Sequence, residues 1–310
     1  MEELARYSDH WLEDQGRLTH PMRYNPATDR YEAVSWDKAF AFIAAKLNAL
    51  ASPDEAIFYT SGRTSNEAAF LYQLFVRQFG TNNFPDCSNM CHEPSGVALG
   101  EQIGVGKGTV TLHDFEQADL ILVFGQNPGT NHPRMLGELR RAVQRGARVL
   151  AFNPLRERGL ERFADPQDAL EMLHNGSERI ASEYYQLRIG GDLAAVAGMI
   201  KHVLERDTEE RAASRAPLLD DAFIAEHTDG FAAFRTGIEA LHWHDLEAQS
   251  GLSEARLRDA GKRYLHAERA IICWGMGITQ HRRSVATIQM LVNLMLLRGH
   301  VGRPGAGICP

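Results

Sequence analysis

The sequence predicts an α/β fold built from open, mostly parallel sheets with flanking helices. The first observation is a set of short apolar runs without polar alternation, at residues 119–124, 148–152 and 270–274. Strands that helices cover on both faces have this character, because neither side of the strand meets water. The second observation is that segments of helical periodicity separate these runs, as βαβ crossovers require.

The first third of the chain predicts two helices and one strand after an irregular start at residues 1–34. A helix is predicted from residue 36 to 50, since Ser35 can cap it and apolar residues recur at helical spacing. A short buried strand is predicted at residues 56–60, and a helix at 66–79 that Gly80 stops. Residues 85–108 are rich in glycine and contain Pro94, which predicts a loop with one short helix near 95–102.

The remaining two thirds predict alternating strands and helices. Strand 119–124, a helix at 134–145 and strand 148–152 make one complete βαβ unit. Asp192 is the expected N-cap of the next helix, and the charged residues 205–220 are expected to form a loop. The other predicted elements are a strand at 184–189, helices at 193–204, 221–228, 231–241, 253–266 and 284–297, and a strand at 270–274.

Composition excludes several classes of protein. With 310 residues, 44 % hydrophobic and 24 % charged, the chain can form two globular domains. The net charge of −7 excludes a nonspecific nucleic-acid binder, which needs a basic surplus to neutralise phosphates. We find no apolar run of about 18 residues and no secretory signal at the N-terminus, so we expect a cytoplasmic protein without a membrane partner.

The four cysteines are Cys87, Cys91, Cys273 and Cys309, too few for a disulfide scaffold. The most informative is Cys91, because His92 follows it directly. A thiolate beside an imidazole suits a soft metal with a proton acceptor next to it. Two other readings stay open: a small buried residue beside an incidental histidine, and a thiol enzyme with Cys91 as nucleophile and His92 as base.

Four predicted strands lead into turns rich in glycine, asparagine or aspartate. In open parallel sheets ligands bind at the carboxyl ends of strands, where backbone N–H groups and helix N-termini face the crevice. Neither a P-loop nor a first-turn GxGxxG fingerprint is present, which disfavours a plain Rossmann dehydrogenase but leaves a nucleotide-bearing ligand. The turns are Gly125-Gln126-Asn127-Pro128, Asn153-Pro154-Leu155-Arg156, Gly190-Gly191-Asp192 and Gly275-Met276-Gly277.

These segments closely resemble the molybdopterin-guanine-dinucleotide oxidoreductases, in the formate-dehydrogenase-like branch that includes the YdeP-like acid-resistance proteins. The resemblance runs from about residue 16 to residue 310. The matching segments are Tyr59-Thr60-Ser61-Gly62-Arg63-Thr64-Ser65-Asn66-Glu67, Asn89-Met90-Cys91-His92-Glu93-Pro94, Gly125-Gln126-Asn127-Pro128-Gly129-Thr130-Asn131-His132-Pro133, Asn153-Pro154-Leu155-Arg156-Glu157-Arg158-Gly159, Ile189-Gly190-Gly191-Asp192 and Trp274-Gly275-Met276-Gly277-Ile278-Thr279-Gln280-His281.

The resemblance implies a molybdenum ion held by molybdopterin guanine dinucleotide, two copies of it in full-length members. It implies Cys91 as the metal ligand and His92 as the residue that accepts the substrate proton or steadies the oxidised metal. Asp192 would contact the guanine edge, and Gln280 and His281 would lie near the pterin. The other implied cofactor-binding residues are Gly125, Asn127, Pro128, Thr130, His132, Asn153, Leu155, Arg156, Gly191, Trp274, Gly275, Met276 and Gly277.

The chain departs from the family pattern at both ends. No cysteine precedes Cys87, so no iron–sulfur cluster is expected from this chain. The family's C-terminal barrel is absent, and we expect either a truncated reading frame or a second chain that supplies the missing part. The expected organisation is an N-terminal extension (1–19), the first part of an incomplete α/β cofactor domain (20–86) and a nearly complete dinucleotide-binding domain (87–310).

The expected function is therefore the cofactor-binding portion of a molybdenum-dependent oxidoreductase. By resemblance, it would carry out a formate-dehydrogenase-like, two-electron oxidation of a small substrate and pass electrons to an acceptor. The alternative is a non-catalytic nucleotide-binding remnant or partner subunit, linked to acid resistance as in YdeP-like proteins. In either case strand 56–60 would lack sheet neighbours here, which leaves apolar surface uncovered.

Overall fold

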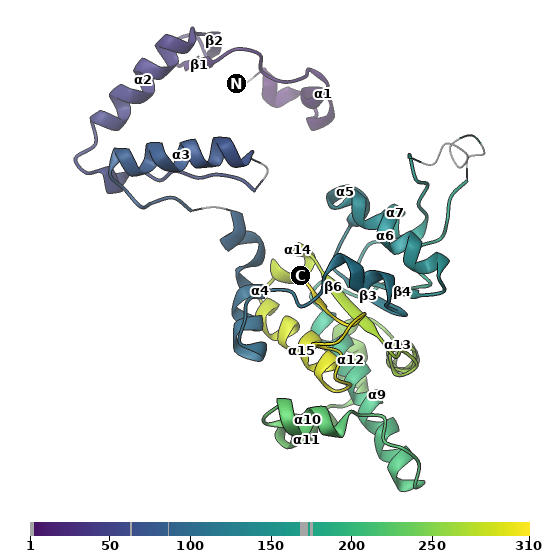
Figure 1. Cartoon of the computed structure of the whole chain (residues 1–310). Coiled ribbons are helices and arrows are strands. Elements are labelled where there is room, and N and C mark those ends of the chain that lie inside the picture. The colour runs from purple at the N-terminus through teal and green to yellow at the C-terminus, as the bar shows by residue number, and fades with distance from the viewer. Residues whose placement is uncertain (1–2, 63, 86, 168–172, 174–175) are drawn as a thin grey trace. The chain divides into compact units, whose positions relative to one another are not determined.

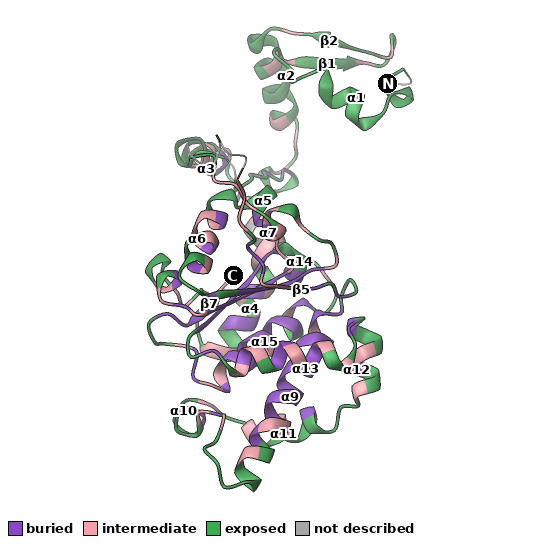
Figure 2. Ribbon diagram, turned by 90° about the vertical axis from the view of Figure 1, so that its right-hand side faces the viewer, coloured by how far each residue is buried: buried purple, intermediate pink, exposed green. Residues whose placement is uncertain are grey.

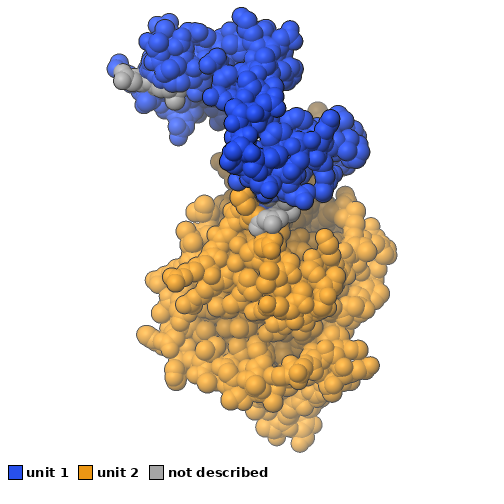
Figure 3. All heavy atoms as spheres, turned by 90° about the vertical axis from the view of Figure 1, so that its left-hand side faces the viewer, with its two compact units in different colours: residues 1–87 blue, residues 88–310 orange. Residues whose placement is uncertain are grey.

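The computed structural model describes residues 3–62, 64–85, 87–167, 173 and 176–310. The chain divides into two compact units, Met1–Cys87 (unit 1) and Ser88–Pro310 (unit 2), which Figure 3 colours separately. The boundary that we predict at residue 86 lies outside the described residues. Every residue of the predicted site belongs to unit 2.

Unit 1 begins with a short helix and a hairpin, where the sequence predicts irregular structure. Helix α1 (Asp9–Asp14) precedes the antiparallel strands β1 (Met22–Asn25) and β2 (Arg30–Ala33). The prediction for residues 1–34 was wrong because α1 is capped by Ser8 and the two strands are held by cross-strand pairing, and neither feature needs a hydrophobic face. All residues of both strands except Asn25 are exposed, so no apolar periodicity marks them.

The two predicted helices of unit 1 are confirmed. Helix α2 (Trp36–Asn48) and helix α3 (Asn66–Phe79) both begin at a serine cap, since the hydroxyls of Ser35 and Ser65 accept backbone N–H groups of the first turn. Gly80 ends α3 with a φ of +104°, a left-handed conformation that glycine adopts without strain.

Residues 56–60 do not form the predicted strand. The Phe58 N–H donates to the Asn83 carbonyl at 2.9 Å, but the described residues offer no strand for this segment to pair with. Phe58 packs into a small core with Val76, whereas Ile57 on the opposite side is 73 % exposed. The sequence therefore has strand character without the sheet neighbours that would make it a strand.

Unit 2 contains one five-stranded parallel sheet in the order β5-β4-β3-β6-β7. The central strands are fully buried apart from Arg148, as their unbroken apolar sequences predict. The open parallel sheet with flanking helices confirms the predicted fold class. The strands are β3 (Leu120–Phe124), β4 (Arg148–Phe152), β5 (Glu183–Tyr185), β6 (Ala270–Trp274) and β7 (Gly307–Cys309).

Helices cover both faces of this sheet (Figures 1 and 2). Four helices pack on the face that presents Leu120, Leu122 and Phe124: α4 (Cys87–Ile103), α9 (Asp192–Ala212), α13 (Glu254–Leu265) and α15 (Ser284–Leu296). Helices α6 (Pro133–Gln144) and α7 (Arg158–Glu161) pack with Ile121 and Val123 on the other face. The remaining described elements are α5 (Pro128–Asn131), α10 (Asp221–His227), α11 (Phe231–Glu239), α12 (Trp243–Ser250), α14 (Met276–Thr279), η1 (Leu4–Arg6), η2 (Pro53–Glu55) and η3 (Leu112–Glu116).

Two predicted boundaries in unit 2 were wrong. The expected loop at residues 85–108 is mostly helix α4, which continues through Pro94 instead of beginning after it. Helix α9 extends to Ala212, whereas the charged residues from 205 onward predicted a loop. Asp207 explains this extension, because its buried carboxylate pairs with Arg211 at 2.7 Å and stabilises the last turns.

Shorter differences remain as well. Strand β5 ends at Tyr185 rather than at residue 189, and helix α12 was not predicted. Strand β7 is not among the predicted elements, because a three-residue segment containing glycine has no strand signal of its own. It forms because Ile308 and its neighbours pair in register with β6. Among the described residues, no helix is both long and apolar enough to cross a membrane.

Candidate functional site

The turns after β3 and β6 meet at the carboxyl edge of the sheet. The Gly277 N–H donates to the Gly125 carbonyl at 3.0 Å, and the Gly275 N–H donates to the Phe124 carbonyl at 3.3 Å. The chain leaves β3 toward β4 and leaves β6 toward β7, on the opposite side. The crevice between β3 and β6 is therefore the topological switch point, where open α/β sheets bind ligands.

The turn after β4 joins the same edge through Asn153. Its side-chain amide donates to the Gln126 carbonyl at 3.3 Å, and its backbone N–H donates to the Tyr185 carbonyl at 3.2 Å. Asn153 is thus buried between the turns of β3, β4 and β5. Three of the four predicted turns are linked by direct hydrogen bonds.

Three polar side-chain atoms at this edge are buried without a hydrogen-bond partner among the described residues: Gln126 Oε1, Thr279 Oγ1 and His281 Nε2. His281 Nδ1 accepts the backbone N–H of Arg283 at 3.4 Å, so Nε2 carries the proton of the neutral ring. Burial lowers the pKa of His281 and favours that neutral ring. Buried polar atoms are normally paired, so these three mark a place for a polar ligand.

Cys91 and His92 lie in the N-terminal half of α4, and the structure connects this helix to the same edge. His92 Nδ1 lies 3.3 Å from the Ser95 hydroxyl, which accepts the indole N–H of Trp274 at 2.9 Å. Ser95 and Trp274 are both buried. This relay fixes His92 relative to the carboxyl end of β6, whereas the sequence placed the Cys91–His92 pair in a loop.

The charge state of His92 follows from its surroundings. Burial lowers its pKa, and the nearby imidazole of His132 lowers it further. His92 is therefore neutral near pH 7 and has a nitrogen that can accept a proton. His132 itself is exposed, at the start of α6. The structure thus brings together two predicted site residues that are 40 positions apart in the sequence.

In the turn after β3, the polar side chain of Asn127 forms hydrogen bonds with other groups of the protein. Asn127 Oδ1 accepts the Thr130 N–H at 3.2 Å and caps α5, and its amide nitrogen donates to Glu157 at 2.7 Å. Pro128 is buried, while Thr130 is exposed. Asn127 therefore holds the shape of the turn with both ends of its carboxamide.

Farther along the turn after β4, the predicted residues Leu155 and Arg156 are on the surface. Leu155 is 66 % exposed. Arg156 pairs with Glu161 at 2.7 Å and lies over the Tyr184 ring, 5.4 Å from its centre. Arg156 is positioned by these contacts, and a phosphate would have to compete with Glu161 for its guanidinium.

Asp192 was predicted to be the N-cap of α9. It is instead the first residue of the helix, and Gly191 occupies the cap position. A Cβ on Gly191 would lie 2.9 Å from the Gln249 carbonyl and from Ser250, so packing against α12 requires glycine there. Asp192 is only 4 % exposed, and burial raises its pKa to about 6. A buried carboxylate next to a helix N-terminus suits a ligand with N–H donors.

The predicted residues at the end of β6 and in the turn that follows it differ in exposure. Trp274 is fully buried, so its side chain supports Ser95 and does not face solvent. Met276, Gly277 and Gln280 are exposed. Sequence reasoning did not select Ser95, Gln126 or Thr279, although Gln126 and Thr279 are polar residues inside the segments that carry the family resemblance and Ser95 directly follows one of them.

The described residues contain no group of three or more His, Cys, Asp or Glu side chains that could hold a metal ion. None of the four cysteines forms a disulfide in the described part of the chain. A single thiolate remains a sufficient protein ligand where a cofactor supplies the other donors, and Cys91 is half-buried.

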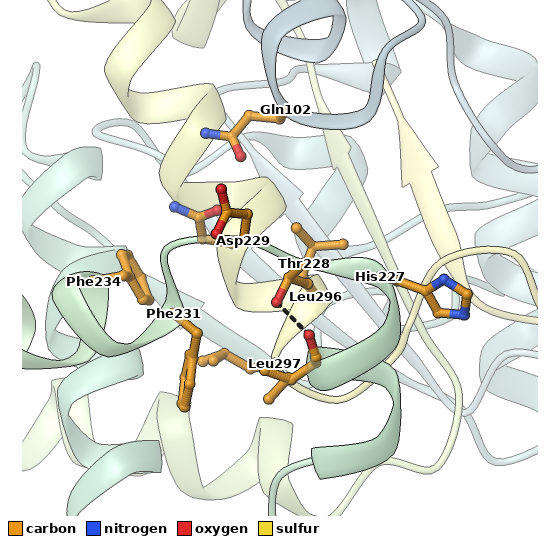
Figure 4. A pocket seen from close by; sticks show the side chains of 10 residues that line it. Gln102, His227, Thr228, Asp229, Phe231, Phe234, Leu296 and Leu297 are labelled. Carbon is orange, nitrogen blue, oxygen red and sulfur yellow. Dashed lines mark hydrogen bonds between the residues drawn. The ribbon is translucent and has the colours of Figure 1, made fainter.

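A separate pocket of about 230 Å³ lies away from this edge. Figure 4 shows that Gln102, Asp229, Phe231 and Leu297 are among the residues around it. Its lining comes from the end of α4, from α10 and α11 with the segment between them, and from the end of α15. No predicted site residue lines it, so we assign it no part in the site.

Comparison with known proteins settles the family. The model of the family described as molybdopterin oxidoreductase matches residues 17–309. The chain belongs to the molybdopterin oxidoreductase family. The family resemblance that we derive from the sequence is thereby confirmed, and the family implies a molybdenum and a pterin cofactor.

Curated relatives extend over the whole chain. Protein YdeP of Escherichia coli is 54 % identical over 310 residues, covering 100 % of this chain and 41 % of YdeP. An uncharacterized oxidoreductase of Mycobacterium tuberculosis is 50 % identical over 308 residues, 99 % of this chain and 39 % of that protein. Formate dehydrogenase H of Escherichia coli is 31 % identical over 299 residues, 95 % of this chain and 38 % of that protein. The chain thus spans about two fifths of the curated relatives it matches.

A solved structure supports the fold. Acetylene hydratase from Pelobacter acetylenicus superposes with a TM-score of 0.68 at 20 % identity, covering 94 % of this chain and 37 % of that structure. At this identity the likeness concerns the fold alone. The residues present fit a molybdenum–pterin group, because a polar ligand at the β3–β6 edge would supply partners for Gln126, Thr279 and His281.

Proposed function

We propose that this chain is the cofactor-binding portion of a molybdenum-dependent oxidoreductase and that it binds a pterin guanine dinucleotide at the carboxyl edge of the β3–β6 sheet. The observation that carries the proposal is the trio of unpartnered buried atoms on Gln126, Thr279 and His281, at the topological switch point. Such an edge favours a polar ligand that reaches several turns at once, as a dinucleotide does.

Cys91 would hold the metal. Its thiol is half-buried in the N-terminal half of α4, and a thiolate is a soft ligand of the kind that suits such a metal. Ser95 and Trp274 fix the turn of helix that follows Cys91 against β6. This support would hold the ligand in one position while the oxidation state of the metal changes.

His92 would move the substrate proton. When bound, the molybdenum cofactor supplies two-electron redox chemistry for a small substrate, by analogy with the formate dehydrogenase relatives. The lowered pKa of His92 keeps its ring neutral near pH 7, so the ring can take a proton as the substrate is oxidised. The contact between Ser95 and Nδ1 orients the ring.

Asp192 and the turn of Asn153 would distinguish the guanine dinucleotide from a bare pterin. The buried carboxylate of Asp192 can accept hydrogen bonds from the N–H groups of a guanine edge. Asn153 places the backbone of the β4 turn, with exposed Leu155 beyond it, at the same sheet edge. The dinucleotide would run along this row of turns.

Metal and nucleotide analysis tests the proposal. We expect molybdenum and acid-released guanylate in the purified wild-type chain, and at least about a tenfold loss of molybdenum in Cys91→Ser, which removes the metal ligand. Cys87→Ser is the matched control, since it makes the same change one helical turn earlier, where the sulfur accepts the Gly62 N–H at 2.9 Å. Equal molybdenum in wild type and Cys91→Ser would contradict the ligand assignment.

The second candidate is a non-catalytic nucleotide-binding remnant or partner subunit. This candidate predicts guanylate without molybdenum in the same analysis. Substrate oxidation, an electron acceptor and a second chain are likewise proposals, because this chain spans only 41 % of YdeP.

A further inference from the structure

Two cysteines outside the proposed site are direct neighbours in the sheet of unit 2. Cys273 of β6 and Cys309 of β7 are register partners in parallel strands. Partners in a parallel pair point to the same face, and both residues pack with Ile271 on the α6 side of the sheet. Ile272 and Ile308, the pair before them, point to the opposite face, which confirms the alternation.

We propose that Cys273 and Cys309 form a redox-active thiol pair that a peroxide converts into a disulfide between β6 and β7. This site is separate from the proposed cofactor site. The two sulfurs lie in the core on the α6 side, whereas α4, which carries Cys91, packs on the other face of the sheet.

The strand geometry permits this bond. Neighbouring strands lie about 4.7–4.9 Å apart. A disulfide accepts Cα–Cα separations of about 4.4–6.8 Å, so the backbone already meets this requirement. Rotation of the two side chains about χ1 then suffices to bring the sulfurs together, without a change in strand pairing.

The two thiols differ in the way that a peroxide-reactive pair requires. Cys309 is half-buried and can be reached from outside, while Cys273 is fully buried. The Cys273 thiol donates a hydrogen bond to the Cys309 sulfur, which lowers the pKa of Cys309 and, together with burial, raises the pKa of Cys273. Cys309 is thus the better nucleophile, and Cys273 retains its proton until Cys309 is oxidised.

The reaction balances in two steps. The Cys309 thiolate attacks one oxygen of hydrogen peroxide, so that an S–O bond forms, the O–O bond breaks and hydroxide leaves to become water with the thiol proton. The Cys273 sulfur then attacks the Cys309 sulfur, the S–S bond forms, and the S–O bond breaks with loss of a second water. Two thiols lose two electrons in total, and the peroxide gains them.

The disulfide would act on the strand that leads into the cofactor turn. Cys273 immediately precedes Trp274, whose indole holds Ser95. A covalent bond to β7 would fix the end of β6 and close a loop that contains α14 and α15. The oxidised form is therefore expected to be the more heat-stable one, because the bond restricts the unfolded chain.

Peroxide titration of the whole chain tests the pair. In the wild type we expect a peptide cross-link between Cys273 and Cys309, a loss of two hydrogen masses, a raised melting temperature, and reversal of all three by a thiol reductant. In Cys309→Ser, Cys273 should stay reduced, with modification slowed on the order of tenfold or more because peroxide cannot reach it. In Cys273→Ala, Cys309 should proceed to the sulfinic acid, since no partner resolves it.

Three results would overturn the proposal. One is a wild-type chain in which Cys309 reaches the sulfinic acid without a cross-link. Another is a disulfide confined to Cys87 and Cys91. The third is equal oxidation of Cys273 with and without Cys309, which would show that Cys309 is not the point of entry. Because the wild-type experiment needs no substitution, a variant that fails to fold leaves the test intact.

Discussion

The contact between the turns of β3 and β6 makes Gly277→Ala the most informative substitution. A Cβ at residue 277 would lie 2.5 Å from the Gly125 carbonyl oxygen and 2.8 Å from the Gly125 Cα. Both neighbours are backbone atoms, so no side chain can rotate away to make room. The two turns must separate, and the hydrogen bond from the Gly277 N–H to Gly125 is then lost.

The expected loss of stability combines these two effects. Forcing an extra carbon into a packed site costs about 1–3 kcal/mol. Loss of one intramolecular hydrogen bond costs about 0.5–1.5 kcal/mol more. We therefore expect the free energy of unfolding of unit 2 to fall by about 2–4 kcal/mol.

Urea unfolding followed by tryptophan fluorescence measures this change. Replacing the exposed Trp11 and Trp36 by phenylalanine leaves Trp243 and Trp274, both in unit 2, as the only sources of the signal. The fitted free energy then refers to unit 2, which is necessary because two units need not unfold in one step.

The matched control is Gly237→Ala in helix α11, where a Cβ meets no atom within 4 Å. There we expect a gain of about 0.5–1 kcal/mol, because alanine restricts the unfolded chain and favours helix. Replacing glycine by alanine is thus expected to lower the free energy of unfolding at residue 277 and to raise it at residue 237. A Gly277→Ala variant that loses less than about 0.5 kcal/mol would refute the argument from turn contact.

Three further predictions concern buried polar groups of unit 2, each measured by the same urea assay. Ser95→Ala should lose about 1–3 kcal/mol, because the buried Trp274 N–H loses its acceptor. Asp192→Asn should gain up to about 3 kcal/mol at pH 8, because the folded pKa of about 6 lies above the unfolded 3.8. The contribution of Asp192 to stability therefore rises as pH falls through 6 toward 4, and the gain of the variant over the wild type should shrink over that range. His300, buried against Tyr264 with no partner for either ring nitrogen among the described residues, has its pKa lowered to about 3 by burial and by Arg303 and Arg298. The contribution of His300 to the free energy of unfolding should fall on the order of 1 kcal/mol per pH unit from 6.5 downward, measured as the wild-type value minus that of His300→Leu; a difference that does not change with pH contradicts the assignment to His300.

The sequence by itself determined the elements whose signal is local. Strands β3, β4 and β6 are unbroken apolar runs, and their burial on both faces follows directly from that composition. Helix α3 has a serine cap at one end and a glycine at the other, so both of its bounds were predicted. The family, too, was readable from the order of residues in the turns.

Tertiary structure decided the elements whose stability comes from distant neighbours. Strand β7 exists because β6 pairs with it, whereas residues 56–60 have strand composition but no described partner strand. Helix α9 continues through a charged stretch because the buried carboxylate of Asp207 accepts the N–H groups of Leu218 and Leu219 as well as the Arg211 guanidinium.

The same division holds for the candidate site. The sequence identified Cys91, His92 and the turns, because each residue type carries its own chemistry. Only the fold showed that Ser95 links His92 to Trp274, and that Gln126 and Thr279 have buried atoms without partners. Helix caps and apolar periodicity act over a few residues, so they can be read from the local sequence. The meeting of side chains that lie far apart in the chain depends on how strands order themselves in the sheet, which no local pattern specifies.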